Sequence, residues 1–159
     1  MIAAAITPAA PHELSDVAAL MRATIEPLRY YNAPAIAAEL RKYTAQSLGA
    51  RTADDALAVL VSRDDAGLTG FCVSRFDDGT IWLDWFGVAE RARGRGLGGA
   101  LISALKDTLP ARDAHKIWCD SRTENVESRA TLDRAGFRCI TTLTDHWYHQ
   151  DYFLWEWCR

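Results

Sequence analysis

The segment RARGRGLGG, residues 91–99, has the composition of an anion-binding loop. A glycine inside a helix lowers the stability of the helix by about 1 kcal/mol relative to alanine. The four glycines of this segment therefore indicate a loop, and one whose backbone a ligand must approach closely. Three arginines add local positive charge. A leucine-striped helical pattern follows at once, and converging N–H groups at a helix N-terminus bind phosphates when cations flank them. We therefore interpret the segment as a phosphate site.

Two other interpretations of these glycines compete with it. Gly94, Gly96 and Gly99 satisfy G-x-G-x-x-G, with Asp120 at a strand end where a dinucleotide fold places its ribose ligand. However, five residues separate the expected strand end at Val88 from Gly94, whereas the dinucleotide turn follows its strand directly. No Gly-Lys-Ser/Thr follows, which excludes a P-loop. A flexible, arginine-rich surface loop without a ligand remains the simplest alternative.

The elements that must position this loop are expected in the order β-α-α-β-β-β-α-β-α-β-β, an α/β fold with a mixed sheet. Asp78-Gly79 predicts a hairpin, and the helix after the glycine segment predicts a parallel crossover. Apolar periodicity predicts strands near residues 2–7, 56–62, 70–76, 80–88, 115–120, 137–143 and 151–158, and helices near 14–25, 34–48 (stopping at Gly49), 97–109 and 121–136.

Bulk composition limits the function classes. A chain of 159 residues suits one domain, and a net charge of −3 offers no general attraction to nucleic acid or to anionic membranes. No apolar run reaches the roughly 20 residues that cross a bilayer, and no basic secretory leader is visible. Four scattered cysteines without a C-x-x-C pair predict reduced thiols in a cytoplasmic protein. The four histidines offer no convincing metal site.

The sequence resembles the GNAT superfamily of acyl-CoA-dependent N-acyltransferases. That family carries Arg/Gln-x-x-Gly-x-Gly/Ala between its fourth strand and third helix, which residues 93–98, RGRGLG, match. The approach FGVAERARG and the placement of Asn125 before Gly136-Phe137 also match the family. The resemblance is strongest over residues 56–140, and the predicted order of elements agrees with the GNAT fold over the rest.

The resemblance implies that acetyl-CoA is the cosubstrate. Its pyrophosphate would lie on the glycine loop, and its pantetheine arm would extend the fourth strand as an added strand. The implied cofactor-binding residues are Phe86, Gly87, Val88, Arg93, Gly94, Arg95, Gly96, Leu97, Gly98 and Asn125. Arg91 could add charge, or, like Arg95, could be exposed without a specific contact.

The expected reaction is direct attack of an amine on the thioester, which requires that an ammonium of pKa near 10.4 lose a proton. Asp84 is the candidate base, because many family members carry a glutamate there and an acid inside IWLDWFGV otherwise needs explaining. A structural carboxylate is the alternative. Leu132 occupies the position of the family's acidic tyrosine, so Ser128 or Ser121 is the candidate proton donor, although Ser121-x-x-Glu124 also resembles a capping box.

The acceptor side is predicted from aromatic residues in expected loops and on the central strand. The candidate substrate-binding residues are Tyr30, Tyr31, Trp85, Trp147 and Tyr148. We expect a single-domain N-acetyltransferase acting on a primary amine of a small molecule or peptide, with a homodimer possible in such proteins. The competing class is a non-catalytic acyl-CoA-binding module, which the absence of the acidic tyrosine favours. Acylation of aminoacyl-tRNA is disfavoured by the net charge.

Overall fold

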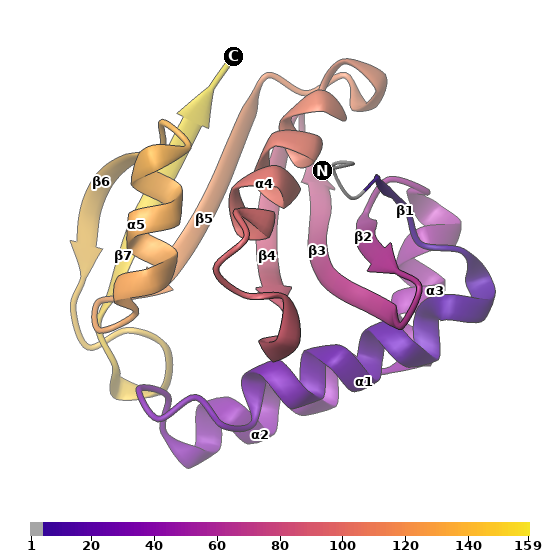
Figure 1. The fold of residues 1–159 in the computed structure, drawn as a ribbon. Coiled ribbons are helices and arrows are strands. Elements are labelled where there is room, and N and C mark those ends of the chain that lie inside the picture. The colour runs from indigo at the N-terminus through magenta and orange to yellow at the C-terminus, as the bar shows by residue number, and fades with distance from the viewer. Residues whose placement is uncertain (1–4) are drawn as a thin grey trace.

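The computed structural model describes residues 5–159, which form a seven-stranded mixed sheet with helices on both faces (Figure 1). The strand order is β1-β2-β3-β4-β5-β7-β6. The strands are β1 (Ile6–Pro8), β2 (Val59–Asp64), β3 (Gly67–Asp77), β4 (Thr80–Val88), β5 (Lys116–Arg122), β6 (Arg138–Leu143) and β7 (Tyr152–Cys158). The α-helices are α1 (Leu14–Ile25), α2 (Ala33–Lys42), α3 (Ala45–Asp54), α4 (Leu97–Asp107) and α5 (Val126–Arg134).

The predicted mixed sheet is confirmed. Strands β2, β3 and β4 form an antiparallel meander, and Asp78 and Gly79 at its second turn have φ angles of 48° and 82°, as a tight hairpin requires. Strand β5 returns parallel to β4 after the α4 crossover. The first strand was predicted over residues 2–7, and β1 begins at Ile6. Residues 1–4 of that prediction lie outside the described residues.

Two predicted helix boundaries are wrong. The helix expected from Pro34 to Leu48 is two helices, because the chain leaves helical geometry at Tyr43 and Thr44 then starts α3 by accepting a hydrogen bond from the Ser47 N–H at 3.1 Å. Gly49 therefore lies inside α3 rather than ending a helix. The Ser121-x-x-Glu124 capping box is also wrong, because α5 begins at Val126.

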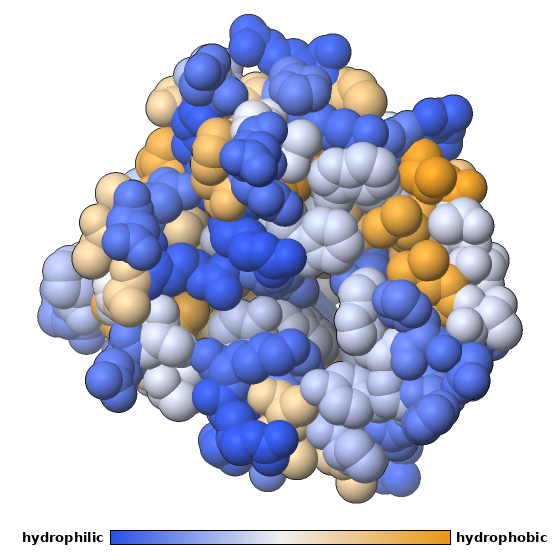
Figure 2. Space-filling view, turned by 180° about the vertical axis from the view of Figure 1, so that it is seen from behind, coloured by the Kyte–Doolittle hydropathy of each residue, from blue (hydrophilic) through white to orange (hydrophobic). Residues whose placement is uncertain are grey.

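The core lies in two layers, one on each face of the sheet. On one face, α4 contributes Leu101 and Leu105 of the predicted leucine stripe, and Leu109, which follows the end of α4 at Asp107, is buried with them. On the other face, α1 and α3 pack on β2 and β3. Seen from that side, apolar side chains also gather at the surface over the part of the molecule that holds the C-terminal strands (Figure 2). The two faces thus differ in how far helices cover them.

Candidate active site

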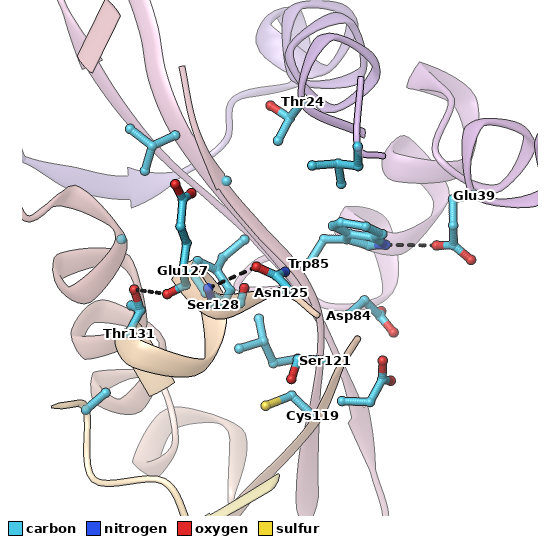
Figure 3. Close-up of a pocket in the computed structure, with 18 of the residues that line it drawn as sticks. Thr24, Glu39, Asp84, Trp85, Cys119, Ser121, Asn125, Glu127, Ser128 and Thr131 are labelled. Atoms are coloured by element: carbon cyan, nitrogen blue, oxygen red, sulfur yellow. Dashed lines mark hydrogen bonds between the residues drawn. The ribbon is translucent and has the colours of Figure 1, made fainter. Parts of the chain in front are cut away.

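Strands β4 and β5 separate from one another and open a cleft. They pair only from Thr80–Lys116 to Leu83–Cys119, although β4 continues to Val88 and β5 to Arg122. The cleft has a volume of about 1080 Å³ and is lined from both strands, from α1, α2, α4 and α5, and from the loop before α2. Figure 3 shows the residues from β4, β5 and α5 that face one another across it. Beyond Leu83 the side of β4 that faces β5 has no strand partner, so an extended amide chain could pair there.

The glycine loop lies at one end of this cleft. Gly94 and Gly96 have φ angles of 74° and 76°, a conformation that L-residues rarely adopt, and no atom lies within 4 Å of a Cβ added at either position. Within residues 5–159, none of the backbone N–H groups of residues 94–99 donates a hydrogen bond. Six unsatisfied donors at a helix N-terminus suit an anion such as a pyrophosphate.

The arginines of the loop have different environments. Arg93 lines the cleft and donates from Nε to the carbonyl oxygen of Val88 at 3.3 Å. Arg91 instead forms an ion pair with Asp64 at 2.6 Å, and Arg95 is exposed and does not line the cleft. Every other residue of the implied cofactor set lines it: Phe86, Gly87, Val88, Gly94, Gly96, Leu97, Gly98 and Asn125.

The start of α5 forms the wall opposite β4. Asn125 caps this helix by accepting a hydrogen bond from the Ser128 N–H at 3.1 Å, and both residues line the cleft (Figure 3). Ser121 also lines it, and its Oγ accepts a hydrogen bond from Trp155 Nε1 at 2.9 Å, which leaves its own proton available. Leu132 is buried in the core at 1% exposure, so it offers the cleft no acid.

Asp84 lies in the cleft at a β-bulge. Val73 pairs with Trp85 and Ser74 with Leu83, so Asp84 is the extra residue of β4. One carboxylate oxygen accepts a hydrogen bond from Arg51 and the other from Arg75. Burial raises the pKa of Asp84 above its ordinary value, against the lowering by the two guanidinium groups. Both oxygens of the predicted base are therefore already engaged.

Asp120, two residues before the end of β5, is a cleft residue that the sequence suggested only as the ribose ligand of a dinucleotide fold. It lines the same cleft, and within residues 5–159 its side chain has no hydrogen-bond or ion-pair partner. Burial, reinforced by the negative charges of Glu39 and Asp84, raises the pKa of Asp120 to about 7. A carboxylate with such a pKa can accept a proton near neutral pH. The sequence signal was a lone acid in a buried strand.

Aromatic rings surround the opposite end of the cleft. Tyr31 lies 5.7 Å from Trp85 and 6.5 Å from Tyr152 between ring centroids, and Trp147 lies 5.1 Å from Tyr152. Trp85 Nε1 donates to Glu39 Oε2 at 2.8 Å (Figure 3). The residues predicted for the acceptor side, Tyr30, Tyr31, Trp85, Trp147 and Tyr148, all line the cleft, and Glu39 and Tyr152 join them.

The turn before β7 is held in an unusual conformation. Tyr148 has a φ angle of 57°, a left-handed conformation that is sparsely populated by non-glycine residues. Asn32 Nδ2 donates to the Tyr148 carbonyl oxygen at 2.8 Å, and the Asn32 N–H donates to Gln150 Oε1 at 3.1 Å. These contacts attach the turn to the start of α2 and place aromatic side chains at the rim of the cleft.

Among residues 5–159, no group of three or more His, Cys, Asp or Glu side chains could hold a metal ion. In the same part of the chain, no helix combines the length and apolar character needed to cross a membrane.

Comparison with solved structures finds the same architecture. Ard1 from Thermoplasma volcanium is 18% identical, with a TM-score of 0.77 and coverage of 99% of this chain and 98% of its own. The PaiA N-acetyltransferase from Thermoplasma acidophilum, in complex with coenzyme A, is 15% identical, with a TM-score of 0.78 and coverage of 99% and 100%. The yncA protein of Salmonella typhimurium, with its cofactor acetyl-CoA, is 18% identical, with a TM-score of 0.78 and coverage of 97% and 92%.

No curated protein sequence matches the chain. The family model for the acetyltransferase (GNAT) family, in contrast, matches residues 20–137. That range contains the glycine loop, both strands that line the cleft and the helix that faces them. The chain therefore belongs to the acetyltransferase (GNAT) family.

Proposed function

We propose that this protein transfers an acetyl group from acetyl-CoA to a primary amine of a small molecule or peptide, by direct attack within a ternary complex. The observation that carries the proposal is the run of six amides at residues 94–99 that donate no hydrogen bond within the described residues, five of which, all but that of Arg95, belong to residues that line the cleft between β4 and β5. The ligands named for two of the similar structures, acetyl-CoA and coenzyme A, support the same donor.

The donor side of the cleft is the face that carries α4 and α5. The glycine loop supplies amides and Arg93 supplies charge for the pyrophosphate. The unpaired part of β4, residues 84–88, offers backbone groups to the two amides of a pantetheine arm. This arrangement would bring the thioester to the point where β4 and β5 separate.

Asp120 is the base in this proposal, in place of Asp84. An amine enters as an ammonium ion, and the free Asp120 carboxylate accepts one of its protons, which leaves a nitrogen lone pair to attack the thioester carbon. As the C–S bond then breaks, the nitrogen loses a second proton, which balances the proton taken up by the departing thiolate. Asp84 has no free oxygen for this task, because Arg51 and Arg75 engage both. Its role is electrostatic: its negative charge helps to raise the pKa of Asp120.

The proton donor for the departing thiolate lies on the other face of β5. Side chains alternate along a strand, so Ser121 points away from the face of Asp120 and toward Trp155 in the α4–α5 core layer. Ser128 reaches the same side of the cleft from α5. Because a thiol of pKa about 8.5 leaves readily, a hydroxyl or its bound water suffices here.

A covalent route through Cys119 is disfavoured. This thiol lines the cleft, but burial raises its pKa well above the ordinary value, so the nucleophilic thiolate is scarce near neutral pH.

The remaining alternative is a module that binds acyl-CoA without catalysis. Its support is Leu132, which leaves the cleft without the tyrosine expected from the family resemblance.

Two measurements together test the proposal. Acetyl-CoA should raise the melting temperature of the protein, and free thiol should appear when primary amines are added, in an amount that matches the acetylated amine formed. Stabilisation without thiol release for any amine in a broad panel would establish the binding module instead. If acetyl-CoA caused neither stabilisation nor thiol release, the assignment of an acetyl-CoA site would itself be wrong.

A further inference from the structure

A second hollow adjoins the acceptor end of the cleft on the face of the sheet away from α4 and α5. Its volume is about 330 Å³, and its lining residues are Asp77, Thr80, Trp82, Trp118, Leu143, Trp147 and Leu154. Trp82 and Trp147 line both the hollow and the large cleft, so the two spaces adjoin one another at these side chains. In Figure 2 the apolar surface on the C-terminal strands lies beside the hollowed centre of this face.

The strand register places the hollow next to Asp120. Trp118 precedes Asp120 by two residues on β5, so both side chains lie on the same face, about 6.6 Å apart along the strand. Leu154 is the neighbour of Asp120 on β7, and Trp82 is the neighbour of Trp118 on β4. An amine held at Asp120 therefore has indole and leucine side chains within reach of a short tail.

The two indoles are held in place by cations on their faces. The Arg75 guanidinium lies 5.3 Å from the centre of the Trp82 ring, and the Lys116 ammonium lies 3.7 Å from that of Trp118. Arg75 is itself paired with Asp84, and Lys116 with Glu156. These contacts favour a preformed hollow, and its volume lies at the lower end of the range for small-ligand sites.

We infer that the acceptor is a small primary amine that carries an aromatic or bulky apolar group about 6 Å from its nitrogen, and that this group occupies the hollow. The inference rests on the proposed function for the amine at Asp120. It assigns Trp82, Trp118 and Leu154 to acceptor specificity rather than to the chemistry. Burial of one ring there should strengthen binding roughly 10- to 100-fold over an amine that lacks the ring.

The test compares phenethylamine with ethylamine, which carry the same ammonium group. Their affinities are measured by calorimetry on the full chain loaded with coenzyme A, so that no turnover is needed, and acetyl transfer is measured separately. We expect phenethylamine to bind at least 10-fold more tightly. Leu154→Asn and Leu143→Asn, each checked by thermal melting for an intact fold, should reduce this ratio to about threefold or less.

Ile140→Asn is the matched control. Ile140 is 39% exposed on β6 and lines neither space, so its replacement should leave the ratio unchanged. Equal affinities for the two amines would overturn the inference even if both were acetylated. If phenethylamine bound tightly but was not acetylated, the hollow would still be the binding site for its ring, and the proposed function would be overturned. If the tripeptide Phe-Ala-Ala bound more tightly than phenethylamine, the inference of a small amine would be wrong, and the acceptor would be the N-terminus of a peptide.

Discussion

Asp120 and Ser121 are consecutive on β5, yet their side chains serve opposite sides of the cleft. Ser121 accepts a hydrogen bond from Trp155 on the α4–α5 side, whereas Asp120, one residue earlier, points to the other face of the sheet. They lie beyond Leu83–Cys119, the last pair that joins β4 and β5. One strand can therefore supply the group that takes a proton from the amine and the group that gives one to the thiolate.

Replacement of Gly96 should remove donor binding without unfolding the protein. At a φ angle of 76°, a valine is strained, and its side chain would stand over the amides that would receive the pyrophosphate. We expect Gly96→Val to weaken acetyl-CoA binding by about 100-fold or more, measured by calorimetry. Gly67→Val is the control, because Gly67, the first residue of β3, has a φ angle of 114° with open space around it. Equal affinity in the two variants would contradict the loop's role.

Asp120 should destabilise the fold as pH rises. Its pKa is raised from 3.8 to about 7, so the folded state binds more protons than the unfolded state between these values, and stability falls across that window. Asp120→Asn removes the free-energy cost of holding this carboxylate charged in the folded state. We expect the variant to match the wild type near pH 4 and to exceed it by about 2–4 kcal/mol at pH 8, measured by urea unfolding.

Asp133→Asn on the exposed side of α5 is the control for this experiment and should show no such growth with pH. A gain for Asp120→Asn that is the same at pH 4 and pH 8 would mean that the carboxylate is not held in an unfavourable environment.

Loss of Asp84 should weaken the fold while leaving the base in place. Asp84→Asn leaves Arg51 and Arg75 without their carboxylate, and because both guanidinium groups are partly exposed we expect a loss of about 1–3 kcal/mol. Removal of the Asp84 charge also lowers the pKa of Asp120, so the acidic limb of the rate profile should move to lower pH. Disappearance of that limb in Asp84→Asn would make Asp84 the base.

Cys119 should be dispensable for the chemistry. Burial keeps its thiol protonated, so incubation with acetyl-CoA should leave no acetyl group on it by mass spectrometry. We expect Cys119→Ala to retain kcat within about fivefold, with Cys158→Ala, an exposed thiol, as the control. If Cys119 became acetylated and lost the acetyl group when amine was added, the reaction would proceed through a covalent intermediate and not by direct attack.

Several features of the fold and of the cleft could be predicted from local patterns in the sequence. The hairpin at Asp78-Gly79, the α4 leucine stripe and the glycine loop each depend on neighbouring residues, and the structure contains all three. The break between α2 and α3 was missed because no glycine or proline marks it, only a capping box at Thr44. Such a short signal is easily hidden inside a longer helical pattern.

The identity of the free carboxylate could not be read from sequence. Asp84 and Asp120 each stand as a single acid in an apolar strand. Two distant arginines, Arg51 and Arg75, engage the first. In the described part of the chain the second is bound by no cation, and burial and the negative charges of Glu39 and Asp84 outweigh Lys42 and Arg75 in setting its pKa. Their difference depends on long-range packing, so only the fold separates a paired acid from an available one.

The pH dependence of kcat/KM for wild type and Asp120→Asn, measured with one amine from pH 5.5 to 10, tests the central claim most directly. In the wild type, log kcat/KM should rise with unit slope and bend near pH 7, where Asp120 loses its proton. In Asp120→Asn the rate should fall by about 10²–10⁴ at pH 7 and keep rising to the pKa of the amine itself. An unchanged bend near pH 7 in the variant would contradict the assignment of Asp120 as the base.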